Sequence, residues 1–291
     1  EENPNKIAGR LWWQLAFPNH AYGRSKKGSA TSIENITQED MRQFVQRTFT
    51  KDNITISVVG DITPEELSNV LDDVFSDLPE SFLGTRLGDG VIENQGQTVI
   101  IEREIPQSVV VFGSNGIKRE DPDWYAATIL FEILSGGFGS RLTEEIREKR
   151  GLTYGVSAYP LSLEKAGIIV GSVSTVNNRV AESIRLIKDI WQKFGDDGPT
   201  FEEMRNAKDY INGSFALRFT NSKSIAGVLN AVQRFDLGTD YLKNRSDLIN
   251  RVTLRELKRV AKRLFKAKEL TFVIVGKPKN IISTMPVPMT Q

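Results

Sequence analysis

The residue types that carry chemistry in hydrolases are scarce in this chain of 291 residues. It contains a single histidine, His20, and no cysteine. A zinc hydrolase needs about three protein ligands, and local sites usually place two histidines one helical turn apart. His20 lies in residues 18–23, whose composition predicts a loop, so we expect a structural role for it. Neither a Ser-His-Asp nor a Cys-His site can be argued around one loop histidine.

The glycine-rich stretch Gly136-Gly137-Phe138-Gly139 is a second candidate. It follows a predicted helix, and it lacks both the Lys-Ser/Thr pair and the Gly-x-Gly-x-x-Gly spacing of phosphate-binding loops. A helix C-cap and a turn account for at least two of the glycines. Exposed backbone here could also pair with an extended peptide, so direct substrate contact is the alternative interpretation.

Charged side chains crowd the predicted helix from Ser140 to Arg150, which Gly151 ends and Tyr154 follows. Arg147 lies among three glutamates and a lysine on this helix. Taken alone, the pattern is typical of a solvated helix face, and Tyr154 of an aromatic residue in a strand.

The composition excludes several classes of protein. With 38 basic and 37 acidic residues the formal net charge is +1, so a strong phosphate-binding surface is not expected and nucleic acid is a poor candidate partner. No run of about 18 apolar residues predicts a membrane span. The chain begins with Glu1 and not with methionine, which indicates processing or truncation.

An internal repeat organises the sequence. Residues 36–60 align without a gap on residues 252–276, at a constant offset of 216. Each copy begins with Thr-x-x-acid, the signature of a capping box, and continues as an amphipathic helix. Each copy ends in an apolar run that predicts a strand, Ile54–Val59 in the first and Leu270–Val275 in the second. If the two units are equivalent, about half of the first unit is absent from this chain.

The rest of the second unit alternates between predicted strands and helices. Strands are expected at residues 98–102 and 108–112, as neighbours joined by a turn, and at residues 154–159 and 167–172. Helices are expected from Asp121 to Gly136, from Ala181 to Phe194, and from a capping box at Thr200. Strands gathered with flanking helices predict an α+β fold with the helices on one face of a sheet.

These residues together carry a family resemblance. The run from Ser140 to Tyr154 resembles the signature in the second half of M16 peptidases, the insulinase, pitrilysin and processing-peptidase family. Residues 18–37 and the Val-Gly pairs at Val59-Gly60 and Val275-Gly276 resemble further motifs of that family. The resemblance implies duplicated M16-type (LuxS/metallohydrolase-like) domains, each a mainly antiparallel sheet with helices packed on one face. Residues 1–85 are then the C-terminal half of an incomplete first domain, residues 86–97 a linker, and residues 98–291 a complete second domain.

One departure from the family pattern decides the expected role. Active members carry His-x-x-Glu-His in the first domain and a third glutamate ligand further on, and none of this is present here. The match begins beyond that region, so Glu1 and Glu2 are not metal ligands, and we assign no metal-binding residue. Zinc is expected in a partner or in a missing N-terminal segment.

Three interpretations remain open: two kinds of M16 peptidase from which this chain could come, and one kind of non-enzymatic protein. The chain resembles most the metal-free partner subunit of bacterial heterodimeric M16 peptidases, which suggests a zinc-bearing M16 subunit as partner and the bacterial periplasm as compartment. It could instead be a fragment of a self-sufficient zinc peptidase, or a homodimer subunit. The third reading is a structural assembly subunit that keeps the fold without the chemistry.

The resemblance also assigns a role to Arg147 and Tyr154. In the family, an arginine and a tyrosine seven residues apart reach towards the zinc site, and these two residues match them. A phenol donor can stabilise the negative charge that builds on a carbonyl oxygen during amide hydrolysis, and an arginine fork can grip substrate carbonyls. Processing-peptidase alpha subunits have a longer glycine-rich loop, implicated in substrate handling, where Gly136–Gly139 lie. We therefore predict Arg147 and Tyr154 as catalytic residues and Gly136, Gly137, Phe138 and Gly139 as substrate-binding residues.

Overall fold

The computed structural model describes residues 3–288, which divide into two compact units. The first unit combines residues up to 26, residues 88–211 and residues from 246 onward. The second combines residues 27–87 with residues 212–245. This division by packing differs from the boundaries at 85 and 98 expected from the repeat, because residues 3–26 pack with the sheet of the second copy.

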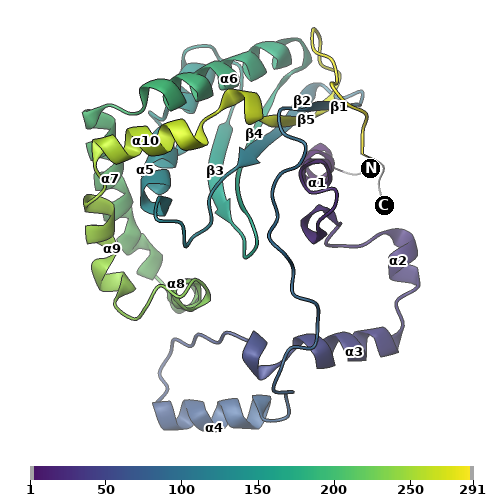
Figure 1. The fold of residues 1–291 in the computed structure, drawn as a ribbon, viewed down its shortest axis with the longest axis vertical. Coiled ribbons are helices and arrows are strands. Elements are labelled where there is room, and N and C mark those ends of the chain that lie inside the picture. The colour runs from purple at the N-terminus through teal and green to yellow at the C-terminus, as the bar shows by residue number, and fades with distance from the viewer. Residues whose placement is uncertain (1–2, 289–291) are drawn as a thin grey trace. The chain divides into compact units, whose positions relative to one another are not determined.

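A mixed sheet of five strands organises the first unit (Figure 1). The order across the sheet is β1-β5-β2-β4-β3, with β1 and β5 parallel and the other pairs antiparallel. The α+β fold with a mainly antiparallel sheet is thus confirmed. The strands are β1 (Thr98–Glu102), β2 (Gln107–Asn115), β3 (Val156–Ser162), β4 (Gly167–Val176) and β5 (Thr271–Gly276).

The expectation that the strands at residues 98–102 and 108–112 are neighbours is wrong. Strand β5, which comes from the end of the chain, lies between them and pairs with both. All six residues of β5 are buried. Pairing with β1 along one edge and with β2 along the other satisfies the backbone groups of this strand.

Helices cover both faces of this sheet. On one face lie α5 (Trp124–Ser135), α6 (Val180–Asp197) and α10 (Leu254–Leu264), packed around the fully buried Trp191 and Phe265. The helices of the second copy therefore share one face, as expected. The opposite face is covered by α1 (Pro4–Ala16), whose Trp12 is fully buried and donates its indole N–H to the carbonyl oxygen of Thr271 at 3.2 Å. Strand β2 contributes side chains to the apolar clusters on both faces, because alternate side chains, such as Val111 and Phe112, point to opposite faces of the sheet.

Several helices begin at side-chain caps. The predicted capping boxes at Thr37 and Thr253 begin α3 and α10, a further one at Thr63 begins α4, and Thr200 and Glu203 exchange backbone-to-side-chain hydrogen bonds at the predicted start of α7. These pairs satisfy amide groups that a helix leaves unpaired at its N-terminus. The helices not yet delimited are α2 (Ala30–Glu34), α3 (Gln38–Thr48), α4 (Pro64–Phe75), α7 (Phe201–Phe215), α8 (Ser222–Arg234) and α9 (Tyr241–Asn250).

The predicted strand at Ile54–Val59 is wrong. This segment of the second unit forms no strand in the structure, although its counterpart is β5. Side chains of α8 contact its backbone, with the Gln233 amide donating to the Ile56 carbonyl at 3.0 Å and the Asn230 amide to the Thr55 carbonyl at 3.3 Å. An apolar run becomes a strand only when another strand pairs with it, and none of the described residues provides one here.

Candidate functional site: a π-helix, a glycine loop and an adjoining cavity

The predicted helix after the glycines is present, but most of it is wound as a π-helix, η3 (Thr143–Glu148). The wider turn shows in the hydrogen bond from the Lys149 N–H to the Glu144 carbonyl at 3.0 Å. Gly151 ends the helix in the left-handed region at φ 57°, where glycine carries no steric penalty. Single π-turns are rare and occur frequently at functional sites.

Arg147 is held above the glycine loop. Its guanidinium carbon lies 5.1 Å from the centre of the Phe138 ring, within the range of a cation–π contact, and its Nε lies 3.2 Å from Oε1 of Glu148. Its basic neighbours Lys149 and Arg150 pair instead with Glu145. Arg147 is therefore oriented by Phe138 of the predicted substrate-binding loop and by the adjacent Glu148, and not by Glu145, which binds Lys149 and Arg150.

Tyr154 projects from a turn that is anchored by the two residues before it. The Leu152 N–H donates to the Ile146 carbonyl at 3.0 Å, and the Leu152 carbonyl accepts from the buried Thr175 hydroxyl at 2.6 Å. The Thr153 hydroxyl lies 2.7 Å from the Ser174 carbonyl oxygen. The backbone is thus fixed while the Tyr154 side chain is 89% exposed.

The structure brings Arg147 together with Phe138 but not with Tyr154. Between residues 3 and 288, no hydrogen bond or ring contact joins Arg147 to Tyr154. Tyr154 also precedes β3 by two residues, so it is a turn residue and not part of the strand.

The glycine loop needs its glycines at two positions. Gly137 has φ 146° and Gly139 has φ 83°, values that side chains strongly disfavour. Gly136 is the C-cap of α5, as expected. Between the glycines, Phe138 is 85% exposed, which is unusual for so large an apolar side chain.

A cavity of about 480 Å³ adjoins this loop. Residues 136–140 form one wall, the end of α5 with Glu132 a second, and one face of α7 with Asn206 and Tyr210 a third. Burial raises the pKa of the Glu132 carboxyl above its ordinary value. No sequence pattern predicts this cavity, because its walls come from segments about seventy residues apart.

Arg141, two residues after the glycine loop, binds α7. Its guanidinium binds Glu203 through two hydrogen bonds of 2.7 and 2.8 Å and lies 4.5 Å from the centre of the Phe194 ring. Burial by itself would raise the pKa of Glu203, but the hydrogen bonds from Arg141 and Thr200 outweigh it and hold that pKa below its ordinary value. Arg141 therefore has a structural role, and it neutralises one carboxylate beside the cavity.

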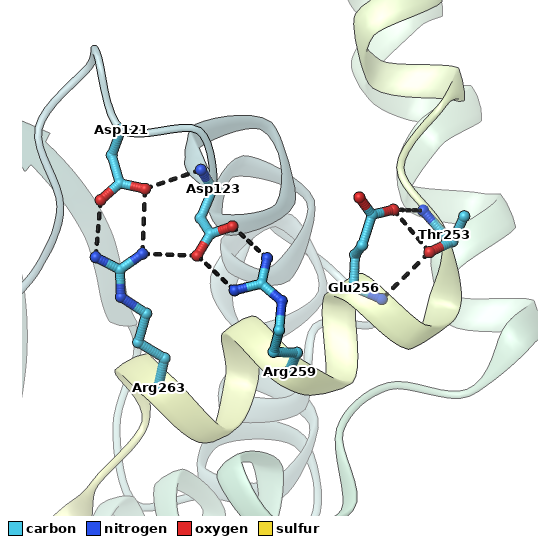
Figure 2. Close-up of polar contacts among 6 residues, drawn as sticks. All are labelled: Asp121, Asp123, Thr253, Glu256, Arg259 and Arg263. Atoms are coloured by element: carbon cyan, nitrogen blue, oxygen red, sulfur yellow. Dashed lines mark hydrogen bonds and ion pairs between the residues drawn. The ribbon is translucent and has the colours of Figure 1, made fainter.

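A second ion network ties α10 to the start of α5 (Figure 2). Arg263 binds Asp121 at 2.8 Å and Asp123 at 2.6 Å, and Arg259 also binds Asp123 with two hydrogen bonds. This network positions the helix whose other end carries the glycine loop. A sequence signal existed, because Asp-x-Asp precedes one helix and two arginines lie one turn apart on another, but nothing in it revealed that the two segments meet.

The described residues do not fit a zinc site. His20 uses both ring nitrogens on backbone groups, with Nδ1 accepting from the Tyr22 N–H at 3.1 Å and Nε2 lying 3.0 Å from the Gly88 carbonyl oxygen. Residues 3–288 contain no group of three or more side chains that could hold a metal ion. The predicted site residues therefore present the Arg147 guanidinium and the exposed Tyr154 phenol, and a cavity adjoins the glycine loop.

The α+β fold and this arrangement define the class of protein. The family model described as the peptidase M16 inactive domain matches residues 35–211. The chain belongs to this family.

Relatives known by sequence carry two kinds of description. An uncharacterized zinc protease YmxG of Bacillus subtilis is 26% identical over 276 residues, which cover 91% of this chain and 64% of that protein. A protein of Helicobacter pylori called the non-peptidase homolog YmxG is 27% identical over 273 residues, covering 92% of this chain and 62% of that one. The chain thus spans a little under two thirds of the length of these relatives.

Solved structures agree on the fold. A peptidase M16 inactive domain from Pseudomonas fluorescens matches with a TM-score of 0.87 at 27% identity, over 98% of this chain and 68% of that one. A protease from Helicobacter pylori matches with a TM-score of 0.79 at 18% identity, over 94% of this chain and 67% of that one. No helix within residues 3–288 has the length and apolar character that a membrane crossing requires.

Proposed function

We propose that this chain is the non-catalytic part of an M16-type zinc peptidase, and that it supplies Arg147 and Tyr154 to a peptide-cleaving site whose zinc is bound elsewhere. The partner proposed is a zinc-bearing M16 subunit, and the substrate is a peptide. The chain by itself is then expected not to hydrolyse peptides.

The observation that carries this proposal is that the structure holds Arg147 and the backbone at Tyr154 in fixed positions. Tyr154 is exposed on a turn whose backbone is fixed by Leu152 and Thr153, and Arg147 is oriented by Phe138 on a π-helix. A fixed backbone lowers the entropy lost when a donor is placed against a developing negative charge. Losing one donor of this kind costs about 2.7–4 kcal/mol of transition-state stabilisation.

The domain assignment is part of the proposal, and it rests on comparing α3 with α10. Both helices have 11 residues and begin with a Thr capping box. Leu257 and Val260 of α10 are fully buried, whereas Met41 and Phe44, at the equivalent positions of α3, are 56% and 55% exposed. An apolar face of identical spacing without a cover supports an incomplete first domain in residues 1–85, a linker at 86–97 and a complete second domain in 98–291.

The first test is the hydrolysis of a quenched fluorescent peptide by the chain mixed with a zinc-bearing M16 subunit. Replacing Tyr154 with Phe removes only the phenol hydroxyl, so we expect kcat to fall by about 10²–10³-fold with little change in KM. Tyr159→Phe is the matched control, since Tyr159 is an exposed tyrosine on the next strand and should leave turnover unchanged. Equal turnover in both variants would remove the catalytic role of Tyr154.

One observation favours a non-enzymatic alternative. The relative from Helicobacter pylori is named a non-peptidase homolog, and a structural subunit would keep the fold without the chemistry. The absence of any hydrolysis by the reconstituted pair would support this alternative. A full-length chain that carries His-x-x-Glu-His itself would instead identify the parent as a self-sufficient peptidase.

A further inference from the structure

The cavity beside the glycine loop contains a carboxylate without a partner. Glu132 lies in the last turn of α5, partly buried, and its carboxyl group makes no hydrogen bond or ion pair with any other residue between 3 and 288. Two effects disfavour a negative charge at this place. Burial raises the pKa of the carboxyl, and the C-terminal end of a helix carries partial negative charge. A bound cation would counter both effects.

The backbone accommodates this carboxylate closely. A methyl group built on Gly136 would come within 2.2 Å of the Glu132 carboxyl carbon and 2.5 Å of the Glu132 carbonyl oxygen. Gly136 has an ordinary helical φ of −73°, so its conformation does not require glycine. The missing side chain leaves room for the carboxyl group against the loop.

The other walls suit a planar cation. Tyr210 on α7 is 58% exposed, Phe138 presents a second aromatic ring, and Asn206 offers an amide oxygen. Between residues 3 and 288, neither the Asn206 amide nor the Tyr210 hydroxyl forms a side-chain hydrogen bond. The cavity lining includes no lysine, arginine or histidine, and the other carboxylate in it, Glu203, is already bound by Arg141. The uncompensated charge of the lining is therefore that of Glu132.

We propose that this cavity is a subsite for an arginine side chain of the peptide substrate, with Glu132 as its carboxylate and Tyr210 and Phe138 as its aromatic walls. A guanidinium presents a rigid fork of donors that fits a carboxylate through two hydrogen bonds, and its flat face stacks on aromatic rings. Lysine, a compact and strongly hydrated cation, would use the rings less well. The subsite rests on the proposed peptide-binding function, and Phe138 places it directly beside Arg147.

The test measures binding to the 291-residue chain without any zinc-bearing partner, by fluorescence anisotropy of a labelled pentapeptide with arginine between pairs of alanines. Its comparison peptide carries citrulline, which has nearly the same shape and no charge. We expect the arginine peptide to bind at least about tenfold more tightly, since a hydrogen bond to a charged group contributes more than a neutral one. In Glu132→Gln this preference should disappear, and in Tyr210→Leu it should weaken.

Glu202→Gln is the matched control, because Glu202 is an exposed glutamate on α7 that does not line the cavity, and the arginine preference should persist in it. Equal binding of the arginine and citrulline peptides, or a preference that survives in Glu132→Gln, would overturn the subsite. Equally tight binding of N-acetyl-arginine amide would also overturn it, by identifying a site for free guanidinium compounds. Because no turnover is measured, failure here leaves the Tyr154 experiment to decide the proposed function separately.

Discussion

At the scale of single residues, Phe138 helps to orient Arg147, which also pairs with Glu148. Their cation–π contact is exposed, and such contacts contribute about 0.5–1 kcal/mol. We therefore expect Phe138→Ala to lower kcat/KM of the reconstituted pair by about two- to fivefold, and Phe138→Tyr, which retains a ring, to lower it less. The substrate for this measurement should contain no arginine, so that binding in the adjoining cavity does not affect the measured kcat/KM.

A double-mutant cycle that combines Phe138→Ala with Arg147→Gln tests whether Phe138 acts on turnover through Arg147. If Phe138 acts through Arg147, Phe138→Ala should cost nothing further in the Arg147→Gln background. Additive losses would show that the ring acts independently of the arginine. The melting temperature should stay unchanged in all of these variants, because Phe138 is 85% exposed.

At the scale of elements, the attachment of α10 to α5 depends on Asp123. Hydrogen bonds from Arg259, opposed by burial and supported by Arg263, hold the pKa of Asp123 below its ordinary value. A carboxyl group whose folded-state pKa is lowered stabilises the fold above its unfolded pKa, near 3.9, and this contribution is lost as the pH falls through the lower folded value. We expect Asp123→Asn to lower the free energy of unfolding of the first unit, which contains Asp123 and both arginines, by about 1–3 kcal/mol at pH 7.

Urea titrations at pH 7 and at about pH 3 measure this effect. The difference between wild type and Asp123→Asn should shrink at the lower pH, because below the unfolded pKa, near 3.9, proton binding to the Asp123 carboxylate of the unfolded chain favours unfolding. Asp189→Asn is the control: Asp189 pairs with Arg185 at 3.4 Å on the surface, and its loss should change stability by less than about 0.5 kcal/mol. A difference that is the same at both pH values would contradict the role of the Asp123 charge.

At the scale of the whole molecule, the two compact units differ in how much they bury. The first contains two clusters of buried apolar side chains on either side of the sheet. In the second, all of whose residues the structure describes, Thr50 alone is buried. We expect the second unit to unfold at lower urea concentration than the first, so unfolding should not be two-state.

The position of the tryptophans makes this prediction measurable. All four, Trp12, Trp13, Trp124 and Trp191, lie in the first unit. Circular dichroism, which detects helices of both units, should therefore begin to change before tryptophan fluorescence does. A Phe44→Trp variant, which places a reporter on α3, should follow the early change. Coincident transitions from all three signals would contradict separate unfolding.

Much of the local structure, and the family, could be predicted from the sequence. Thr-x-x-acid patterns predicted where α3, α7 and α10 begin, because a capping box involves only residues three apart. The apolar runs predicted every strand of the sheet, and Gly151 the end of the helix that carries Arg147. The roles of Arg147, Tyr154 and the glycine loop could be predicted from the resemblance, and they remain predictions.

Which of these segments meet is visible only in the folded chain. The same pattern forms β5 in one copy and no strand at Ile54–Val59 in the other, because strand formation depends on a pairing partner that can lie anywhere in the sequence. The cavity around Glu132 likewise needs α5 and α7 side by side, and the contact of Phe138 with Arg147 needs the loop folded against η3. Gly136–Gly139 first suggested a turn, and the structure adds that this turn forms one wall of a cavity in which, among the described residues that line it, Glu132 carries the one uncompensated charge.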